Sequence, residues 1–275
     1  MTFVLTRPNS DPGSVVSEES GSLRVVAFDL EINPETGMCL DMGAVDSENR
    51  RHHGYVAADF RAFLENADVA GGHNVVDCDM RVCPSLFDGL KAPIFDTLRL
   101  ETLLRPLSRR HALQKEAPAE PGARSNPLSD AEASFRLLIE LVDDWRKLPE
   151  DARRILVELL GDVPGFSGFF RLLGVKPAGL ANPAAEIRRV FAGKLCTSAP
   201  IEAFVDEHPV ELGCVLGFIA VSEAEHSAFP ATPLWLSHHY PETDRIVEAL
   251  RGTICRNPDC EYCRRRSNLT AALKE

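Results

Sequence analysis

The chain has 275 residues, an apolar fraction of 44% and a formal net charge of -11 at pH 7, which allows one large domain or two ordinary ones with proper cores. It has no apolar run of bilayer length and no N-terminal basic region followed by an apolar core, so we expect a cytoplasmic protein with neither a membrane span nor a secretory signal. The excess of acids argues against tight electrostatic binding of nucleic acid.

Residues 1–22 contain Pro, Ser, Gly and acids without periodicity, which predicts a flexible tail. The next run, residues 25–32, is almost continuously apolar and predicts a central strand buried on both faces. Asp29 and Glu31 interrupt this run and project from the same face, because side chains alternate along a strand. Buried like charges are costly unless a cation neutralises them, and oxygen ligands suit Mg²⁺ or Mn²⁺. The alternative is that both acids lie at a solvated strand end without a role.

The following segments predict an α/β fold. Turn residues at 33–37 and the apolar residues 38–45 indicate an antiparallel hairpin, with a third short strand around 53–56 and a helix over 58–64. A further strand ends at His73 and Asn74, directly before a helix that carries Asp79. In α/β proteins such strand ends collect functional groups. Another strand end at residues 94–98 leads into a helix.

A basic cluster then follows in this otherwise acidic chain, and its members are Arg105, Arg109, Arg110, His111 and Lys115. It predicts either a phosphate contact or a solvated helix face. Residues 125–130 begin a long amphipathic helix, for which Ser129 or Asn126 would be the cap. Asp130 lies in its first turn, and taken alone this acid needs no role beyond a favourable interaction with the helix dipole.

Four acids therefore occur in a definite order along the chain: Asp29, Glu31, Asp79 and Asp130. With the segments 28–31, 72–79, 96–100 and 130–131 around them, they resemble the DnaQ-like (DEDD) family of 3′-to-5′ exonucleases, which have an RNase H-like fold. The resemblance covers residues 23–148 and implies a mixed sheet flanked by helices. It also implies that the four carboxylates hold two Mg²⁺ or Mn²⁺ ions about 4 Å apart. Asp29 would bridge the ions while water attacks the terminal phosphodiester of DNA.

One position departs from the family pattern. The third motif of the family carries a His five residues, or a Tyr four residues, before the last Asp, and here these positions are Ser125 and Asn126. That residue would position the attacking water or take its proton. We expect its absence to affect catalysis and not metal binding.

Other residues would complete the site that the resemblance implies. His111 would be the base, or a phosphate contact, and Asn74, Arg110 and Lys115 would contact the nucleic acid. The Asn-Pro-x-x-Asp form that ends at Asp130 resembles the exonuclease portions attached to certain bacterial RecQ-like helicases. This second resemblance implies a helicase partner, in the same chain or as a separate protein.

The rest of the chain, residues 149–275, predicts a mostly helical accessory module, with helices over 152–160, 184–195 and 202–220. Near its end, three cysteines have the spacing C-x4-C-x2-C: Cys255, Cys260 and Cys263. With His238 from a preceding short helix they would make a closed tetrahedral structural zinc site. The same spacing occurs in iron-sulfur proteins, where Cys214 or Cys196 would be the fourth ligand. Three thiols without a metal are the remaining alternative.

Two functions fit these observations. The first is a metal-dependent exonuclease of single-stranded DNA 3′ ends; RNA stays open as a substrate, because discrimination depends on sugar contacts that no motif reports. The second is a catalytically weak domain of the same family that binds nucleic-acid ends or partner proteins. The missing His or Tyr and the net charge both favour the second function.

Overall fold

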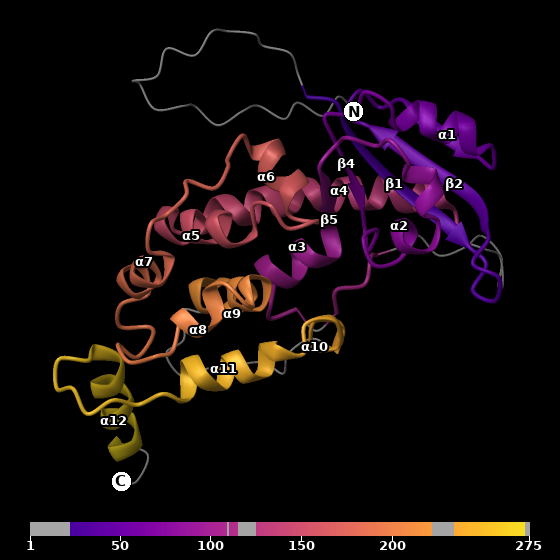
Figure 1. Cartoon of the computed structure of the whole chain (residues 1–275). Helices are drawn as coiled ribbons and strands as arrows, with labels where there is room; N and C mark the ends of the chain where they lie inside the picture. Colours follow the sequence, from indigo (N-terminus) through magenta and orange to yellow (C-terminus); the bar gives the residue numbers. More distant parts are fainter. Residues whose placement is uncertain (1–22, 109, 115–124, 222–233, 273–275) are drawn as a thin grey trace, which may run out of the picture. The chain divides into compact units, whose positions relative to one another are not determined.

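The computed structural model of the chain describes residues 23–108, 110–114, 125–221 and 234–272 (Figure 1). Its contacts divide the chain into two compact units. Unit 1 comprises Met1–Glu101, Arg110–Asp143 and Val163–Lys176, and unit 2 comprises Thr102–Arg109, Asp144–Asp162 and Pro177–Glu275. The units interleave along the sequence, and the expected boundary at residue 148 stays a prediction. The expected tail, residues 1–22, lies outside the described residues.

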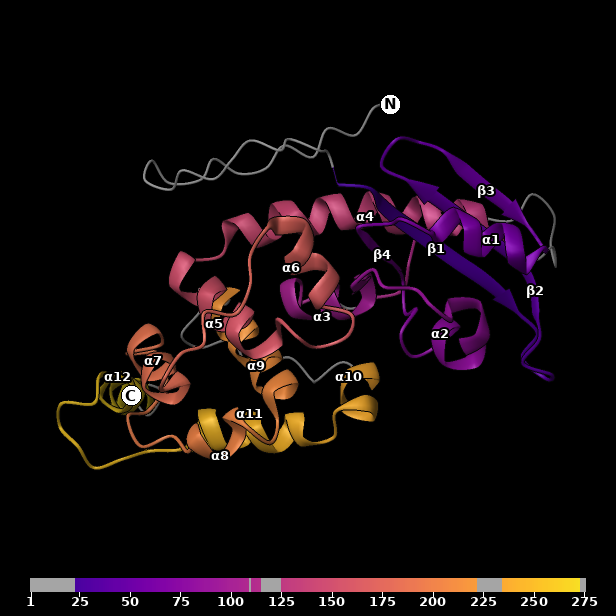
Figure 2. The same ribbon diagram turned by 45° about the horizontal axis from the view of Figure 1, so that its top comes forward.

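Unit 1 is built on a five-stranded mixed sheet with the strand order β3-β2-β1-β4-β5 (β3 is labelled in Figure 2 and β5 in Figure 1). The strands are β1 (Val25–Ile32), β2 (Cys39–Asp46), β3 (Arg51–Gly54), β4 (Val69–Gly72) and β5 (Ile94–Asp96). The pairs β1/β2 and β2/β3 are antiparallel, whereas β1/β4 and β4/β5 are parallel. The prediction of an α/β fold with a mixed sheet is therefore confirmed.

The third strand begins earlier than the sequence predicted, at Arg51 instead of residue 53. The carboxylate of Asp46 accepts hydrogen bonds from the backbone amides of Glu48 at 3.0 Å and Arg50 at 2.9 Å. Asn49 between them has a left-handed φ of 63°, a conformation that Asn tolerates better than most residues. This tight turn returns the chain to the sheet immediately after β2.

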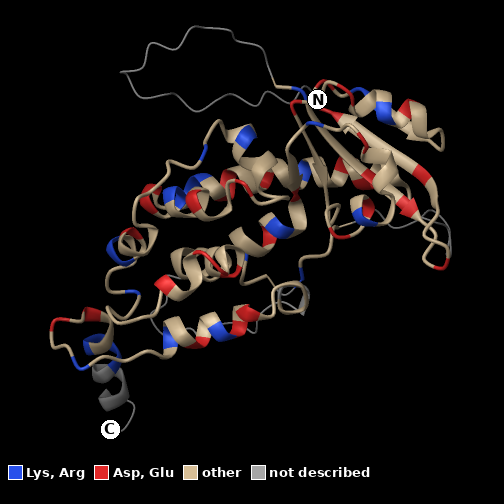
Figure 3. Ribbon diagram, viewed as in Figure 1, with Lys and Arg blue, Asp and Glu red and all other residues tan. Residues whose placement is uncertain are grey.

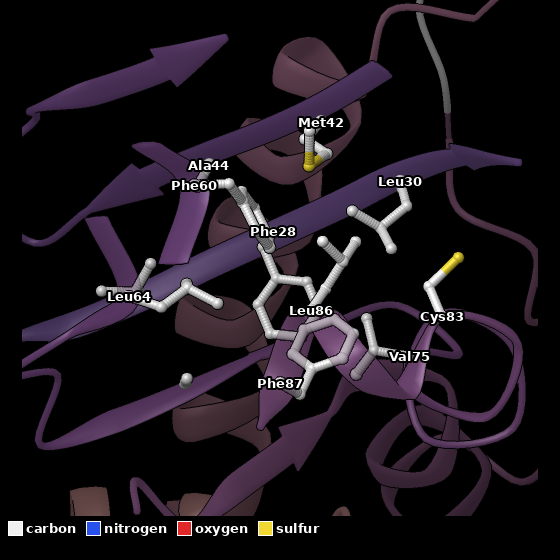
Figure 4. Packing of buried hydrophobic residues seen from close by; sticks show 12 residues of the cluster. Phe28, Leu30, Met42, Ala44, Phe60, Leu64, Val75, Cys83, Leu86 and Phe87 are labelled. Atoms are coloured by element: carbon white, nitrogen blue, oxygen red, sulfur yellow. The ribbon is translucent and has the colours of Figure 1, made fainter. Parts of the chain in front are cut away.

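One face of the sheet is covered by a hydrophobic core (Figure 4). Phe28 and Leu30 of β1 enter this core, where Phe28 packs against Phe60 and Phe87 with ring centroids 6.1 and 5.1 Å apart. Phe60 belongs to α1 (Ala57–Leu64) and Phe87 to a 3₁₀ helix, η1 (Pro84–Phe87). Since Phe28 and Leu30 point to this face, the alternating residues Asp29 and Glu31 belong to the other face.

The remaining helices that lie wholly or mostly in unit 1 are α2 (Asp79–Val82), α3 (Thr97–Leu104), α4 (Pro127–Lys147) and α6 (Ser167–Leu173). Helix α6 lies beside β5, because Gly168 has no side chain and lets the helix approach the backbone of Ile94 and Phe95. On α4, Phe135, Leu138 and other apolar residues are buried, which matches the amphipathic helix that the sequence predicted.

Unit 2 is helical. Its elements are α5 (Glu150–Leu160), α7 (Pro183–Val190), α8 (Glu202–Val205), α9 (Pro209–Val221), α10 (Leu234–His239), α11 (Glu242–Gly252) and α12 (Glu261–Ala272). The expected single helix over 202–220 is two helices, because Pro209 lacks an amide hydrogen and begins a new helix. Figure 3 shows acidic and basic residues side by side along α5 and α7, where Arg189 pairs with Asp151 at 3.2 Å.

Helix α9 is the most apolar element of unit 2, and its residues from Val210 to Ile219 are buried. It packs against α5, with Leu160 next to Gly213. Its 13 residues are fewer than the roughly 20 that span a bilayer. In the ranges that the structure describes, no helix is long and apolar enough to cross a membrane.

Asp96 at the end of β5 orders the turn that follows β4. Its fully buried carboxylate accepts hydrogen bonds from the backbone amides of Asn74 at 2.9 Å, Val76 at 3.1 Å and Leu98 at 3.0 Å. Burial raises the pKa of Asp96, and the amide hydrogen bonds oppose this rise. Asn74 takes a left-handed φ of 62°, so the three amides that converge on Asp96 hold a turn that would otherwise be disfavoured.

We expect Asp96→Asn to destabilise unit 1 by about 1–3 kcal/mol, because the Asn amide group would face backbone donors in place of an acceptor oxygen. Urea unfolding followed by circular dichroism measures the change. The matched control is Asp88→Asn at an exposed position, which should leave the midpoint unchanged. Equal midpoints for both variants would show that the Asp96 carboxylate does not hold the turn.

Candidate functional site

Asp29 and Glu31 lie where β1 extends beyond its parallel neighbour. The pairing of β1 with β4 runs from Val25 to Ala27, whereas its pairing with β2 continues to Ile32. Both acids are half-buried, in contrast to the fully buried first half of the strand. Strand alternation and the end of β4 thus place the two carboxylates on one face, at the carboxyl edge of the parallel strands.

Helix α4 brings the third acid to this place. The side-chain oxygen of Asn126 accepts hydrogen bonds from the amides of Leu128 at 3.0 Å and Ser129 at 3.4 Å, which caps the helix before Pro127. Of the two predicted caps, the structure therefore selects Asn126. Asp130 in the first turn is 2% exposed, and its carboxylate accepts a short hydrogen bond from the hydroxyl of Ser125.

Gly43 permits this approach of helix and sheet. Gly43 belongs to β2 and pairs with Asp29 on the neighbouring strand β1, so the two residues point to the same face. A Cβ at Gly43 would overlap the backbone of Pro127 and Leu128 at the start of α4. Because Gly43 has no side chain, the N-terminus of α4 can pack against the sheet beside Asp29. The role of Gly43 was not predicted from the sequence, since a single Gly in a strand gives only a weak signal of close backbone approach.

Together these elements gather the carboxylates of Asp29, Glu31 and Asp130, whose ligand oxygens lie within 4.8 Å of one another. Like charges at this separation repel strongly in a partly buried place. The pKa of the neighbouring Cys78 thiol is raised, first by burial and then by the negative charges of Asp79 and Asp29. Three hard oxygen donors at one point fit Mg²⁺ or Mn²⁺, as the sequence predicted.

Asp79, the fourth predicted carboxylate, is buried beside the same strand but does not belong to this group of three. Its Oδ1 accepts a hydrogen bond of 2.8 Å from the backbone amide of Leu30, which lies between Asp29 and Glu31. Because β4 has already ended, this carboxylate takes the place of a strand carbonyl. Asp79 is thus fixed next to the group through the backbone of β1.

The other predicted site residues lie around this edge or outside the described part. His73 shares a hydrogen bond of 3.0 Å with the hydroxyl of Thr97, and Asn74 occupies the turn held by Asp96. His111 is half-buried and Arg110 is exposed, in the segment between α3 and α4. Neither belongs to the carboxylate group, and their predicted roles stay predictions. Lys115 lies outside the described residues.

A second group of ligand atoms lies in unit 2 and contains four cysteines: Cys196, Cys255, Cys260 and Cys263. Their sulfur atoms also lie within 4.8 Å of one another, and all four are free thiols. Burial raises the pKa of Cys263 to about 12. At Cys260 burial acts in the same direction, but hydrogen bonds from the amides of Thr197 and Cys263 outweigh it and lower the pKa to about 6. The sequence predicted three of these four residues together.

The fourth predicted ligand, His238, is not in this group, and Cys196 takes its place. His238 is exposed at the end of α10, before α11 begins, whereas Cys255 follows the end of α11. Figures 1 and 2 show α10 and α12 at opposite ends of α11. The 11 residues of α11 span about 16 Å. The grouping therefore favours Cys196, which the sequence offered as an alternative fourth ligand, over His238: residues close in sequence can be held apart by an intervening helix.

We expect Gly43→Ala to weaken Mn²⁺ binding by about 10- to 100-fold, as loss of a residue that positions metal ligands does, because the added methyl group pushes α4 and Asp130 away from β1. Isothermal titration calorimetry with Mn²⁺ measures the affinity. Gly54→Ala is the matched control, because a Cβ there meets no atom within 4 Å. Unchanged Mn²⁺ affinity in Gly43→Ala would contradict this account of how Asp130 is placed.

Comparison of the chain with protein-family models, with curated proteins and with solved structures finds no match. The interpretation of its function therefore depends on the chemistry of the carboxylate group and of the cysteine group.

Proposed function

We propose that this protein is a metal-dependent 3′-5′ exonuclease with an RNase H-like fold, acting on the 3′ ends of single-stranded DNA. The observation that carries the proposal is the convergence of Asp29, Glu31 and Asp130 to within 4.8 Å. These acids come from a strand and a helix almost a hundred residues apart in sequence, and each is one that the resemblance to the DEDD family implied.

The sheet supports the same proposal. An antiparallel hairpin followed by two parallel strands is a mixed sheet of the kind that the resemblance implies. The acids lie at the carboxyl edge of its parallel strands, where ligands of α/β proteins bind. Helix α4 closes this edge from one side with its N-terminus, whose partial positive charge favours a phosphate group or a carboxylate.

In this proposal Asp29, Glu31 and Asp130 hold Mg²⁺ or Mn²⁺. When bound, the metal lowers the pKa of water and stabilises charge on the leaving 3′ oxygen. Asp79 keeps β1 in register at the site through the amide of Leu30, and its second oxygen is the proposed fourth ligand. The hydroxyl of Ser125 donates a hydrogen bond to the carboxylate of Asp130, so Ser125 orients that carboxylate and is not the proposed base. His111 is the residue proposed to accept the proton of water, and Asn74 and Arg110 to contact the nucleic acid.

The test is a nuclease assay of the full chain with single-stranded DNA labelled at the 5′ end and Mn²⁺. We expect a ladder of products shortened from the 3′ end, and no product with EDTA. Asp29→Ala should lower the rate by more than about 100-fold, since loss of even an outer-shell partner of a metal site costs about 10- to 100-fold. The same assay with RNA of matched sequence compares the two substrates.

Glu35→Gln is the matched control for Glu31→Gln, because Glu35 is exposed at the hairpin turn and outside the carboxylate group. It should keep full activity, whereas Glu31→Gln should lose it. Full Mn²⁺-dependent activity of Asp29→Ala, or products shortened from the 5′ end, would contradict the proposal.

A second candidate function is binding of nucleic-acid ends or of partner proteins, among them a helicase, without efficient catalysis. It is favoured by Ser125, which occupies the position of the missing base and is engaged with Asp130. In that case the wild-type protein binds single-stranded DNA in a filter assay but forms no product with Mn²⁺.

A further inference from the structure

The four thiols of unit 2 have the spacing of a single metal ion's coordination shell. The sulfur atom of Cys263 lies 3.8 Å from that of Cys255 and 3.6 Å from that of Cys196. Four thiolates around one ion with metal-sulfur bonds of about 2.3 Å form a tetrahedron whose edges are about 3.8 Å. The observed distances match these edges.

The same distances disfavour the other states of these cysteines. A disulfide requires about 2.05 Å between sulfur atoms, far less than observed. In an iron-sulfur cluster the four thiolates are shared among two or more iron atoms, so the four sulfur atoms surround a larger body. All four sulfur atoms here lie within 4.8 Å of one another, which leaves room for one ion.

Backbone amides donate hydrogen bonds to two of the four sulfur atoms. The amide of Ser198 donates to Cys196 at 3.5 Å, and the amide of Cys255 donates to Cys263 at 3.3 Å. The hydroxyl of Thr197 lies 3.6 Å from the sulfur atom of Cys255. Hydrogen bonds of this kind stabilise thiolates and fix the orientation of metal ligands. These contacts would therefore help the site to hold negative sulfur atoms.

We propose that Cys196, Cys255, Cys260 and Cys263 bind one Zn²⁺ ion in a closed tetrathiolate site. Soft thiolate ligands in a tetrahedral arrangement select Zn²⁺ over Mg²⁺ or Mn²⁺. Because four protein ligands fill the shell, the ion has no open position for water or substrate, and its role is structural. Binding releases the thiol protons to solvent and leaves a site with a net charge of about −2.

The proposed metal site would stabilise residues 253–266, which have few buried apolar side chains. Within the described residues 253–266, only Cys260 and Cys263 are buried, and Ile254 is 61% exposed. Such a segment has almost no hydrophobic core of its own, and small units of this kind depend on a metal or a disulfide. The ion ties the loop after α11 and the start of α12 to Cys196, which precedes α8. Metal binding is thus part of the folding of unit 2.

The test is the metal content of the full chain after dialysis against a weak chelator that strips ions from carboxylates. We expect about one Zn²⁺ per wild-type chain, as a single closed site holds. Cys196→Ser should lose the ion or hold it with an affinity lowered at least about 10-fold. Cys214→Ser is the matched control, because Cys214 is a buried cysteine outside the group. This variant and His238→Ala should both keep the ion.

A second measurement keeps the proposal testable if Cys196→Ser does not fold. Cobalt-substituted wild-type protein should show the intense sulfur-to-metal absorption of a tetrathiolate site. Alkylation mapped by mass spectrometry should modify Cys196, Cys255, Cys260 and Cys263 only after a strong chelator is added. Iron with acid-labile sulfide, loss of zinc in His238→Ala but not in Cys196→Ser, or alkylation of the four thiols in the untreated protein would each overturn the proposal. None of these measurements depends on nuclease activity.

Discussion

The mutual repulsion of three carboxylates is the constraint on which unit 1 depends. Phe28 and Leu30 hold β1 against the core, and this packing fixes Asp29 and Glu31 on the opposite face. Asp130 then meets them from α4. Burial of like charges costs free energy unless a cation is bound. A divalent ion bound at this place would relieve that unfavourable interaction, which is the usual balance between stability and function at metal sites.

The sequence predicted this group because its signals are local. Alternation along one strand places Asp29 and Glu31 together, and a cap followed by Pro127 places Asp130 in a first helical turn. Contacts that depend on tertiary structure were not predictable in the same way. Nothing near Gly43 in sequence indicates that a helix start would lie against it, and nothing near Asp79 indicates that its carboxylate would accept the amide of Leu30.

The cysteine group also contains one residue that local sequence patterns could not predict. Spacing predicted Cys255, Cys260 and Cys263, because ligands a few residues apart share one turn. The fourth ligand, Cys196, is 67 residues before Cys263, and no local pattern connects them. His238 was the nearer choice in sequence, but α11 is a rigid spacer between it and the thiols. Distance along a chain is a useful guide within a loop and a poor one across a helix.

The carboxylate group and the cysteine group differ in their donor atoms, and we therefore expect them to prefer different metal ions. The oxygen donors of unit 1 are hard, number three, and belong to half-buried or buried acids, so they suit an ion that keeps water and exchanges readily. The sulfur donors of unit 2 are soft, and in the zinc proposal they would fill the shell of a tightly held ion. A weak chelator should therefore empty the first site while the second keeps its metal. The catalytic proposal and the structural proposal can be separated in one protein without any mutation.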